Sequence, residues 1–417
     1  MTASAPLDQA WTYPLFEALY GRRSRRFGLG FEMPEGPFCY TSAHSPVALT
    51  ELEEALLVGA GAGFTGLAFW DLPTPPPYPG RGGRTFPATR GGGHTALFIT
   101  NDEGFYVLDD NVAASKLREI ETPDERGKLL DIYRKQRRTL RSGRLDIPLR
   151  APTVSAHDHW DSNRPGSTLF LPVCDVSEAM ISMIAQFVDP ALRRFAPQSG
   201  GFNIVDDRHG FRPAGTERWL KDGFLNDEKV LPLSILERQA CYYVFSEPVA
   251  ICQNMFLATE ALGLGGWKHC GFLSLEILEC MGFRIVTPQG IAVFGNPVGL
   301  DGVFEASCPP YHPTMDAAVD AFFLRTSREK AASVPHRMSE DEHRAGALRI
   351  SAEGLACTKA VCNYIYDTYG RFPGTTDAMH LMSVMQVHHI DTDYYDRFFG
   401  SDAYGPQHAA HMATWHR

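Results

Sequence analysis

An apolar helix that ends at a run of glycines constrains the fold of this chain more than any other sequence feature. Residues 249–262 form the most apolar helix candidate, and Gly263, Gly265 and Gly266 follow it closely. Glycine just after the last apolar residue is typical of a helix C-terminus. The pattern predicts a buried helix that leads into an irregular segment with accessible backbone N–H groups, which extends to Gly271. An ordinary core helix with a glycine C-cap would produce the same pattern.

The composition is that of a globular chain and argues against several classes of protein. Apolar residues make up 44% of the 417 residues, and the formal net charge of −10 argues against a nucleic-acid binder. The sequence contains no apolar run of the roughly 18 residues that a membrane span needs. The nine cysteines are odd in number, no Cys-x-x-Cys pair occurs, and the polar composition of residues 1–10 leads us to expect no signal peptide. We therefore expect a reducing, cytoplasmic environment.

Hydrophobic periodicity predicts helices and strands along the whole chain. The expected helices cover residues 7–20, 49–58, 123–141, 178–187, 249–262, 317–324, 355–369 and 375–388, and Thr50 is expected to cap the second of them. The expected strands cover residues 95–100, 105–108, 167–176, 283–286 and 291–294. Glycine and proline dominate residues 59–93, which we expect to form a loop over a site. The main domain is predicted to cover residues 1–325, with an insertion at 198–230, and a helical C-terminal extension to cover 326–417.

A basic run follows the first predicted helix. It contains Arg22, Arg23, Ser24, Arg25 and Arg26. Guanidinium groups match phosphate oxygens in a bidentate manner, and a serine hydroxyl adds one more donor. The run therefore predicts a phosphate-binding site, although a solvated basic loop would have the same composition.

Histidines and aspartates gather near the C-terminus, where a metal site is one interpretation. His389 and Asp393 are four residues apart and would share one face of a helix. The other interpretation is a polar helix face on which His389, Asp393 and Arg397 form an i,i+4 ladder. No set of ligands has a diagnostic spacing, so the sequence assigns no metal ligand. The residues concerned are His380, His388, His389, His408, His411, His416, Asp391, Asp393 and Asp396, with His157, Asp158, His159 and Asp161 as a further group.

Two of these motifs, taken together, resemble the nitroreductase family. The basic run is similar to that family's N-terminal phosphate-binding motif, with Arg22, Arg23, Ser24 and Arg26 at the matching positions. The helix at 249–262, with its Gly-Leu-Gly turn and a later Gly-Phe pair, resembles the family's central helix and the loop after it. The two motifs lie far apart in the chain and occur in the family's order.

The resemblance implies an α+β sandwich in which helices flank a mixed or antiparallel sheet, with FMN bound at a homodimer interface. It implies hydride transfer between the flavin and a small organic substrate, with the Gly271 amide facing the flavin N5 atom and Cys270 beside it. The long segment before residue 94 is similar to the thiazoline-oxidase branch. The residues implied to hold FMN are Arg22, Arg23, Ser24, Arg26, Arg90, Gly92, Asn254, Gly265, Gly266 and Gly271.

A second glycine pattern, Gly61-x-Gly63-x-x-Gly66, matches the dinucleotide fingerprint in its letters alone. That fingerprint requires a strand before it, a helix after it and an acidic residue about 20 positions further on. Here a predicted helix precedes the glycines, prolines interrupt the segment after them, and no acid occurs near residue 86. The pattern favours a flavin loop or a plain structural loop over a dinucleotide site.

Three functions are therefore compatible with the sequence. The leading hypothesis is an FMN-dependent oxidoreductase that acts as a homodimer on a small molecule, without nucleic-acid or membrane partners. A metal-dependent oxygenase or hydrolase would instead use the C-terminal histidines. A flavin-less interaction protein would keep the fold alone, and the lack of an arginine between Gly295 and Ala321 favours it, because the family has a late phosphate-binding arginine there.

Overall fold

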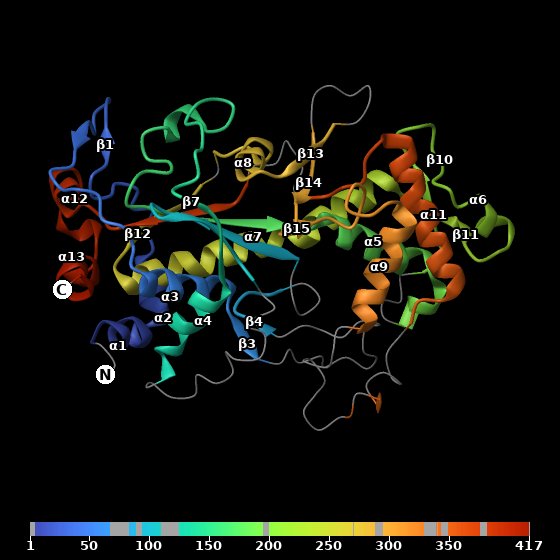
Figure 1. The fold of residues 1–417 in the computed structure, drawn as a ribbon, viewed down its shortest axis with the longest axis horizontal. Coiled ribbons are helices and arrows are strands. Elements are labelled where there is room, and N and C mark those ends of the chain that lie inside the picture. Colours follow the sequence, from blue (N-terminus) through green and yellow to red (C-terminus); the bar gives the residue numbers. More distant parts are fainter. Residues whose placement is uncertain are drawn as a thin grey trace.

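The computed structural model describes most of the chain, and Figure 1 shows a central sheet crossed by one long helix. The described residues are 5–66, 83–88, 94–109, 125–194, 200–269, 271–287, 295–328, 339, 341–342, 349–375 and 382–416. The main helices are α1 (Ala5–Thr12), α2 (Leu15–Gly21), α3 (Glu51–Ala62), α4 (Lys128–Gln136), α5 (Val176–Val188), α6 (Glu217–Lys221), α7 (Leu233–Leu262), α8 (Ser274–Met281), α9 (Met315–Arg328), α11 (Ala352–Tyr369), α12 (Thr392–Phe398) and α13 (Pro406–Trp415). The strands are β1 (Glu32–Met33), β2 (Tyr40–Thr41), β3 (Phe64–Gly66), β4 (Gly83–Arg84), β5 (Thr95–Thr100), β6 (Gly104–Leu108), β7 (Arg137–Ser142), β8 (Thr168–Cys174), β9 (Phe202–Asp206), β10 (Arg212–Pro213), β11 (Asn226–Pro232), β12 (Gly265–His269), β13 (Arg284–Val286), β14 (Asn296–Leu300), β15 (Phe304–Glu305) and β16 (Val384–His388).

Six strands form the central sheet in the order β12, β16, β8, β5, β6, β7, and every neighbouring pair is antiparallel. Phe98 of β5 lies opposite Leu171 of β8, and Gly266 of β12 lies opposite Val387 of β16. The C-terminal region therefore contributes a strand between β12 and β8, inside the sheet.

The two faces of this sheet pack against different elements, because successive residues of a strand point to opposite sides. Leu97 and Ile99 of β5 belong to a buried cluster with residues of α3 and α7. Phe98, between them, belongs to a second cluster with Ile277 and Leu278 of α8. The fold is thus α+β, with helices on both faces of an antiparallel sheet, as predicted.

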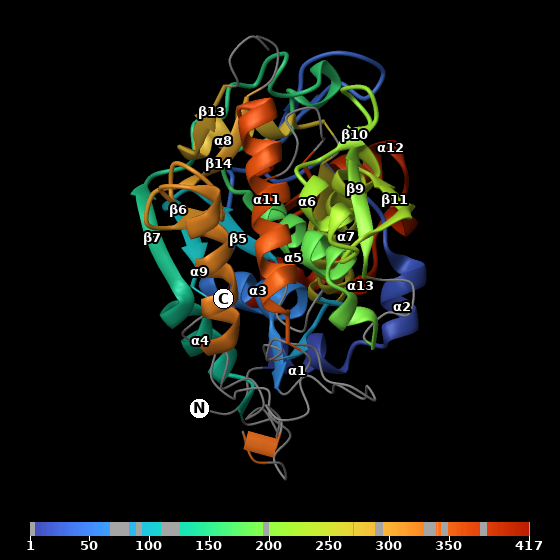
Figure 2. The same cartoon turned by 90° about the vertical axis from the view of Figure 1, so that its right-hand side faces the viewer.

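The 30-residue helix α7 links this sheet to a third buried cluster. Its N-terminal half, including Leu236 and Val244, packs with residues of α5, α9 and α11, which lie side by side in Figure 2. Its C-terminal half, including Met255 and Phe256, packs beneath the sheet with α3. Gly263 ends the helix in the left-handed conformation, with φ of 78°. The C-terminal end of α7 therefore leads directly into edge strand β12, so the prediction of an irregular segment is wrong for residues 265–269.

Several predicted elements differ from the observed ones for identifiable reasons. The helix predicted over 375–388 is wrong: 384–388 form strand β16, and residues 376–381 lie outside the described part. Every residue of β16 is buried, so no alternation marks it as a strand. The helix predicted over 123–141 is α4 followed by β7, and the one over 7–20 is divided at Pro14, the residue before α2.

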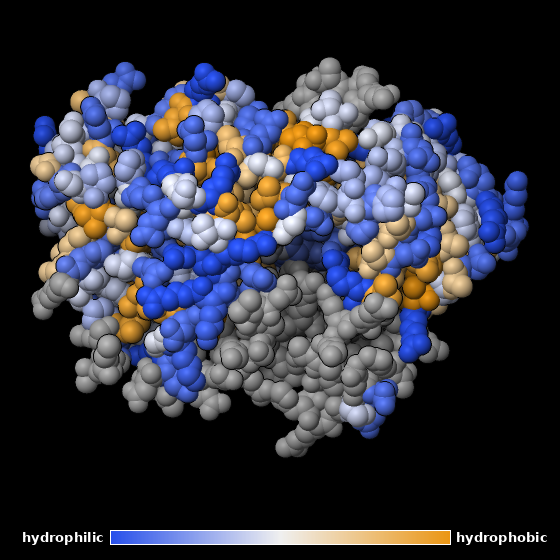
Figure 3. All heavy atoms as spheres, viewed as in Figure 1, coloured by the Kyte–Doolittle hydropathy of each residue, from blue (hydrophilic) through white to orange (hydrophobic). Residues whose placement is uncertain are grey.

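Predictions about a helix cap, a glycine pattern and membrane spans can also be compared with the structure. Thr50 caps α3 as predicted, and Glu53 completes a capping box with it. The glycine pattern at 61–66 lies in the order helix, glycine, strand, which is the reverse of a dinucleotide fold. In the described part of the chain, no helix is long and apolar enough to span a membrane. Among the described residues, the face in Figure 3 is largely hydrophilic, with apolar patches between the hydrophilic areas.

Candidate active site

The basic run lies against the glycine-rich strand β12, although the two are far apart in sequence. Arg25 forms an antiparallel bridge with Gly266, and Gly28 forms one with Ile390 just beyond β16. The aromatic ring of Phe27 stacks on Tyr394 with 4.1 Å between ring centroids, and this buried ring fixes the segment. The fold thus brings together the two motifs that carry the family resemblance.

Two arginines of the run are held by buried carboxylates, and we call this group the arginine junction (Arg25, Arg26, Asp158, Asp161 and Glu260). Arg25 Nη1 lies 2.7 Å from Glu260 Oε2. Arg26 donates to Asp158 Oδ1 at 2.5 Å and to Asp161 Oδ2 at 2.6 Å. Its guanidinium also lies over the Trp267 ring of β12, 3.7 Å from the centroid. These contacts hold the basic run in one position against the sheet.

Asp158 ends a short 3-10 helix (Ala156–Asp158), and Asp161 lies in the turn that follows it. Burial raises the pKa of Asp161 to about 7, although its ion pair with Arg26 opposes that shift. Asp161 Oδ1 and Trp267 Nε1 are both buried without a hydrogen-bond partner among the described residues. The junction therefore keeps one acceptor and one donor available for a further group.

Gly271 lies directly against this junction. A Cβ atom at this position would fall 2.3 Å from Asp158 Oδ2 and 3.0 Å from Ser155 Oγ. Ser155 donates its backbone N–H to the Gly271 carbonyl at 3.0 Å. A side chain larger than hydrogen cannot fit here, which explains why the chain has glycine at the position where the resemblance implies contact with a flavin.

The remaining residues of the basic run lie beside a pocket that adjoins the junction. Arg23 and Ser24 line this pocket of about 610 Å³ together with Arg25 and Glu260 of the junction and residues of α13. Arg23 donates to the backbone carbonyls of Tyr20 and Arg22, and the Arg22 guanidinium lies 4.7 Å from the centroid of the Phe256 ring. Within the described residues neither Arg22 nor Arg23 forms an ion pair, so their positive charges stay available for an anion.

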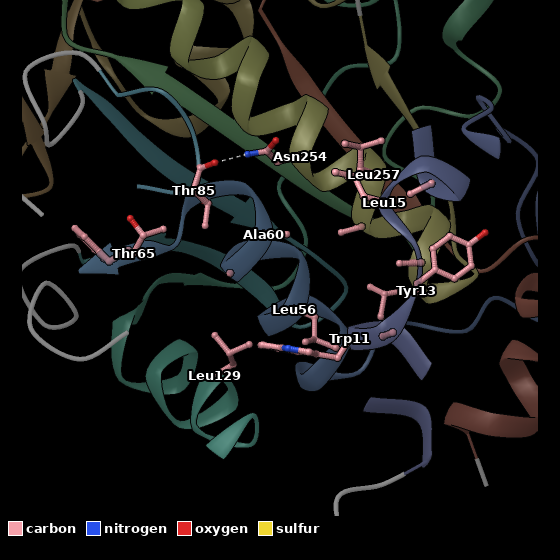
Figure 4. A pocket seen from close by; sticks show the side chains of 17 residues that line it. Trp11, Tyr13, Leu15, Leu56, Ala60, Thr65, Thr85, Leu129, Asn254 and Leu257 are labelled. Carbon is pink, nitrogen blue, oxygen red and sulfur yellow. Dashed lines mark hydrogen bonds between the residues drawn. The ribbon is translucent and has the colours of Figure 1, made fainter. Parts of the chain in front are cut away.

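Asn254, another predicted flavin contact, lines an adjacent and mainly apolar pocket of about 640 Å³. Figure 4 shows this pocket between α1, α3 and α7, with the Asn254 amide hydrogen-bonded to the Thr85 carbonyl at 2.9 Å. Tyr13 lines both pockets, so they adjoin. Such volumes lie in the usual range for small-molecule sites, about 300–1,000 Å³.

The predicted site residues thus fall into four groups. Arg26, Gly265, Gly266 and Gly271 lie at or beside the arginine junction, Arg23 and Ser24 line the pocket of about 610 Å³, Arg22 packs on the Phe256 ring, and Asn254 lies in the apolar pocket. Cys270, Arg90 and Gly92 lie outside the described residues. The sequence did not identify Asp158, Asp161 and Glu260 as partners of the arginines. The available signal was that a buried arginine needs a carboxylate partner.

The C-terminal histidines are arranged differently from the predicted polar ladder. His389 precedes α12, which begins at Thr392, and it is buried, so the ladder with Asp393 and Arg397 is wrong. Instead His389, His411 and His416 surround Glu53, and we call these four residues the histidine cluster. His388 and His408 are buried elsewhere, and His380 lies outside the described residues. The sequence did not identify Glu53 as the partner of these histidines, because it lies far from them in the chain, at the start of α3.

Comparison with known proteins yields little. No family model and no curated protein matches the chain. Among solved structures, the chain is similar to a protein from Ralstonia eutropha JMP134 described as a putative nitroreductase. The two are 14% identical with a TM-score of 0.28, over 65% of this chain and 76% of the other. A likeness this low carries no conclusion about function.

Proposed function

We propose that this chain is an FMN-dependent oxidoreductase with a nitroreductase-like fold, acting on a small organic substrate. The observation that carries the proposal is the bridge between Arg25 and Gly266. It supports the resemblance because a phosphate-binding run and a flavin-contacting glycine loop must meet in space to serve one cofactor. A solvated basic loop is the alternative interpretation of residues 22–26. Such a loop would not form a bridge with a buried strand.

The donors around this junction fit the chemistry of FMN. Arg22 and Arg23 carry guanidinium groups without ion pairs to described residues, and Ser24 adds a hydroxyl, which suits a phosphate. Gly271 has no side chain between its backbone and the junction, and Trp267 Nε1 is a buried donor without a partner among the described residues. Bound FMN would supply hydride transfer through its ring. The residues of the chain would bind, orient and shield it.

Asp161 is the group best suited to hold a proton at this site. Because burial raises its pKa to about 7, it gains or loses a proton near neutral pH. Its Oδ1 atom has no partner among the described residues, so a proton there would be available to a neighbouring group. Arg26, bonded to Oδ2, would keep the carboxyl oriented in either state.

The cofactor is FMN rather than FAD on this proposal, because the glycine pattern at 61–66 lacks the geometry of a dinucleotide site. The full chain should be purified and its cofactor released by heat and identified by mass. FMN is the expected result, together with a yellow protein before release. Recovery of FAD would contradict the cofactor assignment, and failure to bind added FMN would overturn the proposed function.

We also propose a homodimer, in which a second copy completes the flavin site. Large apolar side chains are exposed on α1 and α2, next to the apolar pocket: Trp11, Leu15, Phe16, Leu19 and Tyr20. Exposed apolar patches of this kind often mark interfaces. Light scattering of the flavin-loaded protein should give twice the chain mass, and a flavin-loaded monomer would contradict the proposal.

The reducing cytoplasm expected from the cysteine count stays a prediction.

A further inference from the structure

Three imidazoles of the histidine cluster point the same nitrogen at one carboxylate oxygen. Glu53 Oε1 lies 2.7 Å from His411 Nε2 and 3.3 Å from the Nε2 atoms of His389 and His416. Glu53 belongs to the first turn of α3, His389 follows β16, and His411 and His416 belong to the last part of α13 and its C-cap. Three segments from the two ends of the chain therefore converge on one point.

The outer nitrogens of two of these rings determine what the inner nitrogens can do. His389 Nδ1 lies 2.9 Å from the Val47 carbonyl oxygen, and His411 Nδ1 lies 2.7 Å from the Leu262 carbonyl oxygen. A carbonyl oxygen only accepts, so both Nδ1 atoms carry the proton. In the neutral ring the Nε2 atom then presents a lone pair. This is the arrangement in which backbone carbonyls orient the histidines that bind a metal.

At the centre of the cluster, hydrogen-bond acceptors of the histidines consequently face a further acceptor. Two Nε2 lone pairs point at Glu53 Oε1, which is itself an acceptor. Protons alone could bridge them only if His389 and His411 were both cations, in a place where both residues are 2% exposed and Glu53 is fully buried. Burying two or three positive charges around one carboxylate is costly. A single cation at the centre satisfies all four groups at once.

The carboxylate is held in the orientation that a cation needs. Glu53 Oε2 accepts from the Thr50 backbone N–H at 2.6 Å and from the Thr50 hydroxyl at 2.8 Å, which leaves Oε1 facing the histidines.

The distances also match a small tetrahedral site. A zinc ion with ligand distances of about 2.0–2.1 Å has ligand atoms about 3.3–3.4 Å from one another. Two of the three distances from Glu53 Oε1 are 3.3 Å, and all the ligand atoms lie within 4.8 Å of one another. Imidazole nitrogens with one carboxylate oxygen suit zinc and neighbouring transition metals rather than calcium or magnesium.

We propose that Glu53, His389, His411 and His416 bind one divalent transition-metal ion, with zinc as the expected occupant. Four protein ligands and nearly complete burial are typical of a structural site rather than a catalytic one. The ion would fasten α13 and the segment after β16 to the start of α3. This site does not depend on the proposed flavin site, so it would bind the metal ion whether or not the chain binds FMN.

The test measures zinc binding by the full chain, purified without a metal-affinity column and stripped with a chelator. Zinc is then titrated in competition with a colorimetric chelator. Two variants remove one ligand each with little change in packing: Glu53→Gln, because glutamine also serves in a capping box, and His416→Ala, at the partly exposed C-cap. His44→Ala is the control, since the exposed His44 belongs to a separate group with Asp391 and Asp393.

The parent and His44→Ala should each bind about one zinc ion per chain, the stoichiometry of a closed four-ligand site. Glu53→Gln and His416→Ala should bind at least about tenfold more weakly, since losing even an outer-shell partner costs that much. Far-UV circular dichroism of the stripped proteins checks that each variant is folded. A folded parent that binds no zinc would overturn the proposal. So would zinc binding that both ligand variants retain, or binding that only His44→Ala abolishes.

Discussion

The arginine junction and the histidine cluster are both buried groups of charge where distant parts of the chain meet, yet they differ in how their polar atoms are satisfied. In the junction, donors face acceptors: Arg25 faces Glu260, and Arg26 faces Asp158 and Asp161. In the cluster, acceptors face an acceptor.

The difference shows which buried group is balanced without a metal ion. Two arginines against three carboxylates leave one negative charge in the junction, and a proton on Asp161, whose pKa is about 7, removes it. The histidine cluster has no comparable solution, because His389 and His411 donate outward through Nδ1 to Val47 and Leu262. A buried site in which two imidazole lone pairs face a carboxylate points to a cation, whereas a site in which guanidinium groups face carboxylates needs none.

The largest expected effect on stability comes from a substitution that breaks the junction. Glu260→Ala leaves Arg25 buried, with 6% of its side chain exposed, and without its carboxylate. Removing one partner of a buried ion pair costs about 3–5 kcal/mol in the free energy of unfolding. Urea denaturation measures this loss. The paired variant Arg25→Met with Glu260→Met should recover most of it, and a single variant as stable as the parent would show that the pair is not part of the buried scaffold.

The next effect concerns the histidine cluster. A ligand that binds only the folded state stabilises it by about 2.7 kcal/mol at a concentration one hundred times its dissociation constant. Zinc at that excess should therefore raise the free energy of unfolding of the stripped parent by about this amount. Glu53→Gln should show no such gain. Equal stabilisation of both proteins by zinc would place the ion elsewhere.

A smaller, pH-dependent effect sharpens the comparison at Asp161. Its pKa in the folded state, about 7, lies above the ordinary value of 3.8, so the folded chain retains a proton that the unfolded chain has lost between these values. Stability should fall as pH rises through this window, by up to about 1.4 kcal/mol per pH unit, and level off above pH 7. Asp161→Asn should remove this contribution. Comparing unfolding of the two proteins from pH 5 to 8 tests it, and parallel profiles would contradict the raised pKa.

Sequence patterns predicted the local parts of this structure and failed where distant segments meet. Thr50 as a helix cap and the strands at 95–100 and 105–108 are determined by neighbouring residues, and they are confirmed. Strand β16 was missed because both of its faces are buried, which removes the alternation that identifies a strand. The pairing of Arg26 with Asp158 joins loops that no periodicity connects.

The histidine cluster shows the same limit more sharply. Glu53 has a sufficient local explanation as the partner of Thr50 in a capping box, so nothing in its neighbourhood indicates a second role. Its three histidines lie more than three hundred residues away, with irregular spacing between them. The packing of α13 against α7 brings His411 and His416 to α3, and the position of strand β16 in the sheet brings His389 there.

The central claim is that the two regions bind different ligands, and the FMN and zinc content of two variants tests it most directly. Arg22→Ala should weaken FMN binding by about tenfold or more, because a charge-assisted hydrogen bond to phosphate is worth about 1.5–3 kcal/mol, and it should keep its zinc. His389→Ala should lose zinc and bind FMN as the parent does. If Arg22→Ala bound FMN as tightly as the parent while His389→Ala lost it, the flavin site would belong to the histidine cluster and the central claim would be wrong.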